Sequence, residues 1–363
     1  MGYTIVLLFT NSHLVNYTCS RYISAYWCVS TVLGSMVYTQ VLTGIPLGLH
    51  YTPGIYTSYY SVIHIYREVY SGSLYRYTHS QVASLVYTGL LVHTSRGIFH
   101  GSHFYSTSVV WIGIAALGVL MAMGFMGYIL PWGQMSYWGA TVITGLLITV
   151  PSLVPWILGG YHTYSPTIYR YYIIHSILSV CVLGYLVLHV LYLHLVSSSS
   201  INVHGSSNRV HLYTWLFYKD ILTLWLQVVA IGVQVSSGVI MLSHIDNTLE
   251  VSTLVTPVHI VPEWYFLVYY TVLKAIPSGP SGFMVMISYM YVLNTYGEPY
   301  NTSSLVECTG YTGKYFLESL LCILVFYLQC MGVQLPVVKY ILYSRSYLLV
   351  SVECSVCWMD YNY

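Results

Sequence analysis

The sequence predicts an all-α fold, a polytopic transmembrane helical bundle with about eight transmembrane helices. Of its 363 residues, 56% are hydrophobic and only 6% are charged, and the mean hydropathy is +0.67. An ordinary soluble domain carries roughly a quarter charged residues. The apolar residues also gather in runs near or above the roughly 20 residues that a helix needs to cross a bilayer. A soluble globular fold is therefore not expected.

Eight apolar runs, separated by polar and by glycine- and proline-containing segments, predict the membrane helices. These runs cover residues 27–48, 74–99, 108–130, 171–196, 221–243, 283–296, 315–333 and 337–357. We expect the first four helices to form an N-terminal domain (1–200) and the others to form a C-terminal membrane domain (201–363).

Two long connections interrupt the runs. Residues 131–170 open with Pro131 and contain further proline and glycine, which predicts short helices at the membrane surface. Residues 244–282 contain four prolines, and a loop of this length is usually functional. Since the predicted spans alternate in direction, both connections lie on the same side of the membrane.

Charge and cysteine spacing argue against other kinds of site. The formal net charge is +1 and no basic block occurs, so no nucleic acid partner is expected. The N-terminus has no basic flank before its apolar run, and we expect no cleaved targeting peptide. Cys354 and Cys357 form a Cys-x-x-Cys pair, but Trp358 follows where covalent haem attachment requires histidine. We interpret the pair as ordinary apolar helix residues.

Four histidines repeat one spacing in two of the predicted helices. His79 and His93 are fourteen positions apart in the second span, and His175 and His189 have the same spacing in the fourth. This interval makes almost four helical turns, so both histidines of a helix face nearly the same way, about 21 Å apart along the axis. Each helix therefore presents one imidazole at each of two depths.

The second and fourth spans run in the same direction, because a single crossing separates them. His79 is then level with His175, and His93 is level with His189. A histidine within the membrane is expensive and usually faces a partner or cofactor, and imidazole is a usual axial haem ligand. A single membrane histidine is more often a hydrogen-bonded packing residue, but four at matched depths favour two bis-histidine haem sites.

Small residues and arginines accompany these histidines. Gly113 and Gly127 in the third span repeat the same spacing, and Gly34 lies in the first span, so glycine is available where a flat cofactor needs clearance. Close helix packing is the alternative role for these glycines. Arg76 and Arg96 each lie three positions from a histidine and can pair with haem propionates, or else extend to the membrane interface.

Three motifs resemble mitochondrial cytochrome b. They are Arg-Tyr-Thr-His at 76–79, Gly-Tyr-Ile-Leu-Pro-Trp-Gly-Gln-Met at 127–135 and Pro-Glu-Trp-Tyr at 262–265. The resemblance runs from about residue 27 to 282 and then thins to the segment 331–336. The chain is continuous and has the same histidine spacing twice, whereas the plastid-type relative is split and has a longer spacing in its second pair of ligands. Ser30 departs from the family, which usually has glycine there.

The resemblance implies two b haems inside a four-helix N-terminal bundle, the low-potential one at His79 and His175 and the high-potential one at His93 and His189. It also implies a quinol-oxidation pocket between the two long connections, with Glu263 as proton acceptor. The residues implied as its lining are Tyr265, Tyr128, Phe125, Gly139, Tyr270, Pro262 and Trp264. Without the motif, the favoured role of Glu263 is that of a carboxylate that satisfies amides at a helix start.

A second pocket is implied on the opposite side. His194 lies five positions after His189, and Lys219 and Asp220 open the fifth span. In the family, the residues that match His194 and Asp220 bracket the quinone that is reduced. The alternative is an interfacial histidine and an ion pair at a helix start.

The activity implied by the resemblance is that of the core subunit of ubiquinol:cytochrome c oxidoreductase, complex III, in the mitochondrial inner membrane. Ubiquinol is oxidised on the positive side and ubiquinone is reduced on the negative side, which contributes to a proton gradient. The implied partners are the Rieske iron-sulfur protein, the cytochrome c-one subunit, other complex III subunits and lipids, in a dimeric complex.

Other protein classes remain open from the residues alone. A plastid-type cytochrome b or a dihaem membrane anchor of a dehydrogenase would also carry paired histidines. A haem-free transporter or channel would use polar residues along a path and would show no b-type absorption bands.

Overall fold

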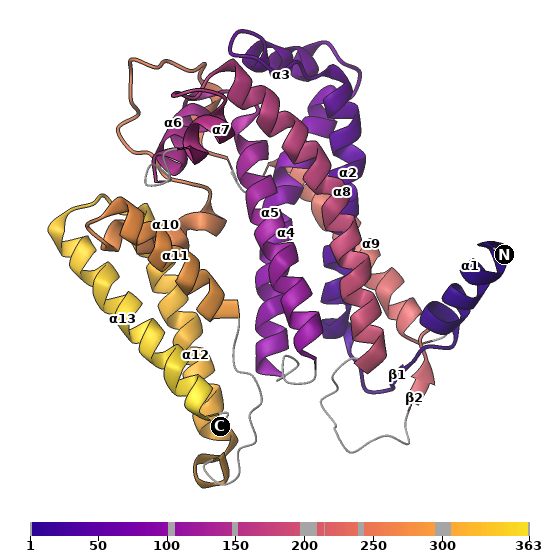
Figure 1. Cartoon of the computed structure of the whole chain (residues 1–363). Coiled ribbons are helices and arrows are strands. Elements are labelled where there is room, and N and C mark those ends of the chain that lie inside the picture. The colour runs from indigo at the N-terminus through magenta and orange to yellow at the C-terminus, as the bar shows by residue number, and fades with distance from the viewer. Residues whose placement is uncertain are drawn as a thin grey trace. The chain divides into compact units, whose positions relative to one another are not determined.

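The computed structural model describes residues 2–100, 106–146, 152–196, 209–213, 215–238, 243–294 and 306–361 (Figure 1). Helices make up nearly all of the secondary structure of these residues, and one pair of three-residue strands accompanies them. This arrangement confirms the predicted all-α fold class.

A long helix occupies each of the eight predicted runs. These helices are α2 (Val29–His50), α4 (Gly72–Phe99), α5 (Thr107–Ile129), α8 (Ser165–Val196), α9 (Leu216–Ser237), α11 (Gly279–Asn294), α12 (Val306–Val333) and α13 (Val338–Tyr361). Several boundaries differ from the prediction by a turn or more; α8, for example, starts at Ser165 although its run begins at residue 171. Apolar runs predict the existence of a helix better than its ends, because the ends depend on local capping. The predicted positions 239–242 and 295–296 lie outside the described residues.

Four segments among the described residues are both long and apolar enough to cross a membrane. They are Ala25–His50, which contains α2, together with α5, α8 and α9. The helix α4 has 28 residues but is less apolar, since it carries Arg76, Arg96 and two of the spaced histidines. Such polar residues persist in a membrane helix when they face other helices or a cofactor.

The connection 131–170 contains the predicted short helices, α6 (Gln134–Gly145) and α7 (Leu153–Leu158). Several further short elements were not predicted. They are α1 (Gly2–Thr10) with the π-helical turn η1 (Asn11–Val15), the 3₁₀ turns η2 (Ala25–Cys28), η4 (Ile245–Thr248) and η5 (Trp264–Phe266), α3 (Ser58–Arg67) and α10 (Leu267–Ala275). A sheet of β1 (Thr18–Ser20) and β2 (Arg209–His211) pairs Cys19 with Val210 in antiparallel register. Elements this short leave little periodic pattern in the sequence.

The chain forms two compact units that are interleaved along the sequence. The first comprises Met1–Leu49, Val69–Gly118 and Val180–Met241, and the second comprises His50–Glu68, Val119–Ser179 and Leu242–Tyr363. Two of the boundaries between units fall within α5 and α8. The division into domains at residue 200 stays a prediction.

In the first unit, α4 packs against α9. A hydrogen bond of 3.1 Å from Gln234 Nε2 to Oε1 of the buried Gln81 joins the two helices. The helix α9 ends at Gly238, whose positive φ of 58° suits glycine and lets its N–H bond to the carbonyl of Gln234. An apolar cluster of Cys19, Ile23 and Trp27 includes a residue of β1.

In the second unit, α10 packs against α11, α12 and α13, which lie together in Figure 1. The core of this group contains Val268, Val272, Ala275, Tyr289, Leu328 and Leu348. A separate core joins the end of α5 to α6 and to the start of α8, through Ile129, Trp132, Ala140, Ile168 and Tyr171. Cys354 is buried in α13, and the side chain of Cys357 lies outside the described residues.

Lys274 stabilises the end of α12. Its Nζ donates hydrogen bonds to the carbonyls of Met331 (3.2 Å), Gly332 (2.8 Å) and Gln334 (2.8 Å). The last carbonyls of a helix have no partner within the helix and carry partial negative charge, so a cation is favourable there. Burial lowers the pKa of Lys274 to about 8, so the group is still mostly an ammonium at pH 7.

We expect Lys274→Met to destabilise the protein, because three carbonyls lose a charged donor. Hydrogen bonds to charged groups are each worth about 1.5–3 kcal/mol. The midpoint of thermal unfolding in detergent measures the loss. Lys339→Met is the matched control, since the Lys339 ammonium lies beside the rings of Tyr340 and Tyr343 at 6.0 and 5.9 Å. Equal midpoints for the two variants would contradict the role of Lys274.

Candidate cofactor and substrate sites

His93 and His189 lie together in the first unit. Their ring centroids are 6.2 Å apart and their planes meet at 63°. Two imidazoles that bind one metal ion from opposite sides hold their centroids about 6 Å apart when each nitrogen–metal bond is about 2 Å. The spacing of this pair therefore fits a single shared ion.

Ser30 and Arg96 hold the imidazole of His93. Ser30 Oγ lies 3.1 Å from His93 Nδ1, and Arg96 Nη2 donates to the same oxygen at 3.3 Å. Arg96 Nη1 also donates to the carbonyl of Trp27 at 3.1 Å. A serine oxygen has two lone pairs and can accept both bonds. In that arrangement Nδ1 carries the proton, and the Nε2 lone pair is the one that can bind a metal.

His79 and His175 belong to different units, and each has its own partner. His79 Nδ1 lies 2.9 Å from Oγ1 of the buried Thr43. His175 Nδ1 donates to the carbonyl of Met123 at 2.9 Å. A carbonyl only accepts, so His175 carries its proton on Nδ1 in this bond, and Nε2 is its metal-binding atom. The pairing of His79 with His175 stays a prediction.

Glycines face three of the four histidines. A Cβ at Gly127 would lie 2.7 Å from His175 Cε1, and one at Gly113 would lie 3.3 Å from His189 Cε1. Gly44 has the same relation to His79, at 3.1 Å. These three positions leave little or no room for a side chain beside an imidazole. A Cβ at the predicted Gly34, by contrast, would meet nothing within 4 Å.

Two residues beside His79 were not predicted from the sequence. Thr43 contacts its imidazole, and Gly44 faces it. Gly44 follows Ser30 by fourteen positions, and this further occurrence of the spacing was the available signal. The two predicted arginines both belong to α4. Arg76 is partly buried, three positions before His79, and Arg96 lies in the last turn, where its hydrogen bonds tie it to the start of α2.

Glu263 is partly buried at the start of η5, in the second unit. Its side chain makes no capping hydrogen bond to that turn, so the helix-start role that was considered as an alternative is wrong. Burial raises the pKa of Glu263 to about 7, and the nearby Tyr128 hydroxyl partly offsets this rise. A carboxyl group with this pKa can exchange a proton near neutral pH.

The other residues of the predicted quinol-oxidation pocket lie in the same unit. The hydroxyl of Tyr270 donates to the carbonyl of Ile260 at 3.2 Å. Gln329 Nε2 donates to the carbonyl of Trp264, also at 3.2 Å. The remaining predicted residues are Phe125, which packs on Tyr171 with ring centroids 6.2 Å apart, Gly139 in α6, Pro262 before η5 and Tyr265 within it.

The two long connections contact each other within this unit. Asn247 Oδ1 accepts from both the backbone N–H and the hydroxyl of Ser136, each at 2.9 Å. Gln134 N–H donates to the carbonyl of Leu249 at 3.0 Å. These bonds satisfy amides at the start of α6 that have no partner within the helix. The sequence predicted that the connections lie on one side of the membrane, but nothing in it marked Asn247 as the residue that joins them.

The turn before α6 explains part of the motif at 127–135. Trp132 adopts a left-handed φ of 56°, which costs a non-glycine residue about 1–2 kcal/mol. Its side chain is 2% exposed, within the core formed with Ile129 and Tyr171. Burial of a side chain this large offsets the backbone cost. A side chain at Gly133 would overlap Asn247, so glycine is required where the connections meet.

Two residues of the predicted quinone-reduction site lie at the start of α9 and contact the N-terminal part of the first unit. Lys219 Nζ donates to the carbonyl of Ile23 at 2.6 Å and lies 4.5 Å from the centroid of the Trp215 ring. Asp220 lies near Cys28 and Thr31, and its Oδ1 is buried without a hydrogen-bond partner in the described part of the chain. The structure shows no ion pair between Lys219 and Asp220, both of which it describes, and this does not favour the alternative of a simple ion pair.

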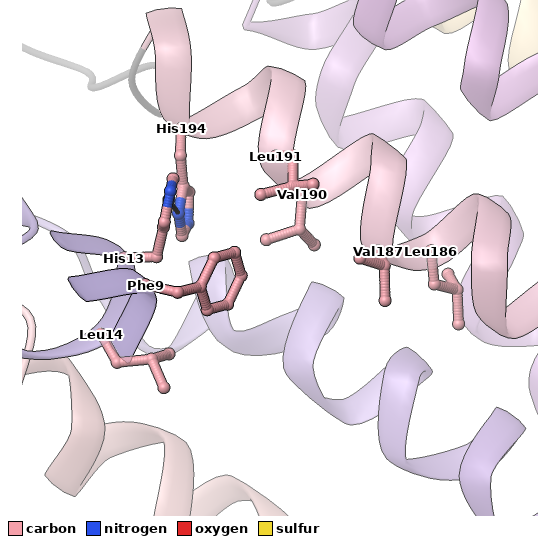
Figure 2. A pocket seen from close by; sticks show the side chains of 8 residues that line it. All are labelled: Phe9, His13, Leu14, Leu186, Val187, Val190, Leu191 and His194. Carbon is pink, nitrogen blue, oxygen red and sulfur yellow. Dashed lines mark hydrogen bonds between the residues drawn. The ribbon is translucent and has the colours of Figure 1, made fainter. Parts of the chain in front are cut away.

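His194 lies at one end of an apolar pocket in the first unit (Figure 2). The volume of this pocket is about 290 Å³. Its lining comes from the N-terminal elements and from the last turns of α8: Phe9, His13, Leu14, Leu186, Val187, Val190, Leu191 and His194. The N-terminal part of this lining was missed from the sequence, because the apolar segment at the N-terminus was assigned no structure.

Two family models match the chain. The one described as "Cytochrome b/b6/petB" matches residues 14–197, and the one described as "Cytochrome b(C-terminal)/b6/petD" matches residues 250–351. Among curated relatives, cytochrome b of Plasmodium berghei is 38% identical over 96% of this chain and 93% of its own length. That of Toxoplasma gondii is 38% identical, with 92% of each chain covered, and that of Rickettsia bellii is 35% identical over 84% of this chain and 77% of its own.

Among solved structures, a chain described as "Hyperthermophilic respiratory Complex III" has a similar fold. The TM-score is 0.87 over 99% of this chain and 97% of the other, at 21% sequence identity. This likeness shows that the two chains share one helical architecture.

Proposed function

The chain belongs to the cytochrome b family, and from this premise we propose that it is the quinone-handling core subunit of a mitochondrial-type ubiquinol:cytochrome c oxidoreductase, complex III. Membership of the family makes it an integral membrane protein that binds b-type haem. In the proposed activity, ubiquinol is oxidised on the positive side of the membrane and ubiquinone is reduced on the negative side. The observation that carries this proposal is the spaced imidazole set, with three of its Nδ1 atoms engaged by protein groups.

We assign one b haem to His93 and His189 and the other to His79 and His175. The 6.2 Å separation of the first pair and the glycines beside the rings support ligation over simple packing. Hydrogen bonds at Nδ1 orient an imidazole and raise the basicity of the other nitrogen, as is usual for metal-bound histidine. Bound at these sites, the two haems would supply one-electron transfer across the membrane.

We assign proton acceptance in quinol oxidation to Glu263. Quinol loses two protons when it becomes quinone, and these protons need a titratable group to leave an apolar pocket. Glu263 suits this role since its pKa is raised to about 7 and its carboxylate makes no capping bond. The aromatic residues of the same motifs would line the pocket. Asn247, through its bonds to Ser136, holds the two long connections side by side.

We assign quinone reduction to the region of His194, Asp220 and Lys219. Asp220 has one buried oxygen without a partner among the described residues, and His194 lies at the end of an apolar pocket. A quinone presents two carbonyl acceptors on an apolar ring, so a pocket with polar groups at its end suits it. Lys219, which bonds to the carbonyl of Ile23, ties the N-terminal segment to α9.

The partners and location follow from the same proposal. The Rieske iron-sulfur protein would accept one electron from the quinol, and the cytochrome c-one subunit would act next, in a dimeric complex of the mitochondrial inner membrane. A dihaem anchor of a dehydrogenase, a plastid-type cytochrome b and a haem-free transporter are the competing functions. The match of family models to both halves of the chain supports the first function over an anchor or a transporter.

A redox titration of the purified complex tests the haem assignment. We expect two b-type bands with separate midpoint potentials, and His189→Leu should remove one band and leave the other. His162→Leu is the control, because His162 is exposed in the link before α8. A wild-type protein with no b-type band, or with only one, would contradict the two-haem assignment.

A further inference from the structure

Two imidazoles from distant parts of the chain meet at the end of the apolar pocket. His13 lies in η1, and His194 lies in the last turn of α8. Their Nδ1 atoms are 3.1 Å apart, and their ring planes meet at 14° (Figure 2). The ring centroids are 5.4 Å apart, which matches the nitrogen separation plus the distance from each centroid to its nitrogen. The two rings are therefore nearly coplanar and joined edge to edge, as an N–H···N hydrogen bond requires.

This geometry constrains the protons of the pair. A hydrogen bond between two Nδ1 atoms needs one donor and one acceptor, so the two nitrogens share a single proton. When His13 donates, the Nδ1 of His194 is an acceptor and its proton lies on Nε2. His194, a lining residue of the pocket, then carries an N–H that can donate to an acceptor.

Tyr17 holds the ring of His194 from a second direction. Its ring stacks on His194 with centroids 4.1 Å apart and an angle of 21° between the planes. The Tyr17 carbonyl accepts from the N–H of Leu212, just after β2, which anchors Tyr17. The Tyr17 hydroxyl is buried and has no hydrogen-bond partner among the described residues. A hydroxyl group close to His194 is therefore available to bond to a ligand or to water.

The rest of the pocket wall is apolar. Phe9 lies against His13 with ring centroids 4.7 Å apart, and the other lining residues, apart from the two histidines, are aliphatic. Both imidazoles are partly exposed, and Asn11 and Ser12 next to His13 are exposed. His13 is therefore partly accessible from outside the chain, and its Nδ1 faces His194.

We propose that His13 is a positioning residue for quinone reduction, which presents His194 as a donor to a quinone carbonyl and replaces the proton that His194 gives up. The inference rests on the proposed function and names a residue that the family resemblance did not. Its ligand class is a para-quinone with an apolar tail, for which the pocket provides an apolar wall and one polar end.

The proton step moves one proton through both rings. A proton from water adds to His13 Nε2, His13 Nδ1 passes its proton to His194 Nδ1, and His194 Nε2 passes its proton to the quinone oxygen. One N–H bond forms and one breaks on each ring, and one O–H bond forms on the quinone. The proton accompanies one electron, which the proposed redox activity supplies. Both rings end neutral, each in its other tautomer.

Release of the product allows the pair to reset. Each ring then moves its proton to its other nitrogen by exchange with water, from Nδ1 to Nε2 in His194 and from Nε2 to Nδ1 in His13, with no net gain or loss of protons. The relay thus accounts for one of the two protons that a quinone takes up. Asp220 stays the proposed source of the other.

Two substitutions of His13 in the complete complex separate its roles. His13→Asn keeps a donor near the position of Nδ1 but cannot pass a proton on, and His13→Ala removes both functions. The assay follows b-haem reduction by a short-chain ubiquinol that enters the negative-side pocket while an inhibitor blocks the positive-side pocket. The relay is tested equally in this direction, because the reverse reaction passes through the same proton positions.

We expect His13→Ala to raise the KM for the ubiquinol about tenfold, the value of roughly one hydrogen bond, and to lower the maximal rate by about tenfold or more. His13→Asn should restore the KM but not the rate.

In the wild type the rate should rise with pH, because the proton leaves to water through His13, and His13→Asn should lose this rise. The titratable groups that contact the pair among the described residues are its own two rings and Tyr17. His211→Asn, at an exposed histidine of β2, is the matched control and should leave all three measurements unchanged.

The outcomes distinguish the two levels of the proposal. Wild-type KM, rate and pH profile in His13→Ala would overturn the role of His13, and so would a wild-type rate in His13→Asn. If His194→Asn slows the reaction while both His13 variants do not, the quinone-reduction site stands and only the role of His13 is lost. If His194→Asn also has no effect, the assignment of the site itself is wrong. The intensity of both b-haem bands in each variant verifies assembly, and His13→Asn, which is closer in size to histidine, carries the test where His13→Ala does not assemble.

Discussion

Replacing Gly127 by Ala is expected to empty the haem site of His175 and to leave the helical bundle assembled. The added Cβ would lie 2.7 Å from His175 Cε1, closer than a methyl group can approach another carbon, and 3.1 Å from its Nδ1. The imidazole, as the end of a side chain, must therefore turn away. It then loses its bond to the carbonyl of Met123 and the direction in which Nε2 faces a metal. Overpacking of this kind costs about 1–3 kcal/mol, which is too little to unfold the helical bundle. It is enough, however, to displace the His175 ring from the orientation that ligation requires.

The matched comparison uses two other glycines of α5. A Cβ at Gly118 would meet nothing within 4 Å, so Gly118→Ala should keep both haems. At Gly113 the nearest atom, His189 Cε1, is 3.3 Å away, so Gly113→Ala should shift the potential of one haem without losing it. The haem content per protein, from the absorption spectrum of the pyridine complex, orders the three variants. Full haem content in Gly127→Ala would contradict the proposed role of His175 as a haem ligand in the orientation that faces Gly127.

Glu263→Gln is expected to slow quinol oxidation about 100-fold, the lower end of the range for loss of a general base. The amide keeps the size and the polarity of the side chain, so both haem bands should stay intact. Glu250→Gln is the matched control. Glu250 lies in the same connection, but it is exposed and accepts a hydrogen bond from Tyr60 at 2.9 Å. Equal turnover in the two variants would remove Glu263 from the proton path.

The pH dependence of quinol oxidation provides a second measurement on the same residue. Burial raises the pKa of Glu263 from 4.5 to about 7, so the carboxylate that accepts a proton becomes the main species only as the pH rises through 7. The wild-type rate should therefore increase between about pH 6 and about pH 8. Glu263→Gln should lose this rise, because its amide does not titrate in that range. A rise of the same size in the variant would assign the titration to another group.

The helices and the histidines could be predicted because both depend on periodic signals. An apolar run of membrane length has few alternatives to a helix, since lipid offers no partner for free backbone groups. The interval of fourteen between His79 and His93 is a geometric statement about one helix face, and it holds without knowledge of the fold. The alternative role of Glu263 at a helix start failed for a local reason, since only coordinates reveal which groups its carboxylate reaches.

Contacts between separate segments could not be predicted in this way. Asn247 joins two connections through Ser136, and Thr43 bonds to His79, yet neither residue belongs to a spacing that marks it. His13 was overlooked since its short element has no repeat to reveal it. Such partners depend on where the chain returns after tens of residues, and a linear pattern does not encode that return.

By itself the sequence determined the membrane class, the eight helical segments and the faces on which four imidazoles project, because each follows from hydropathy or from the 3.6-residue turn. Only the tertiary structure decided which atom lies at the engaged Nδ1 positions, which glycines face the rings and that His13 meets His194. The physical reason is the distance along the chain between the groups that interact. Helix formation is local along the chain, whereas a hydrogen bond between side chains needs two segments to be placed so that donor and acceptor are about 3 Å apart.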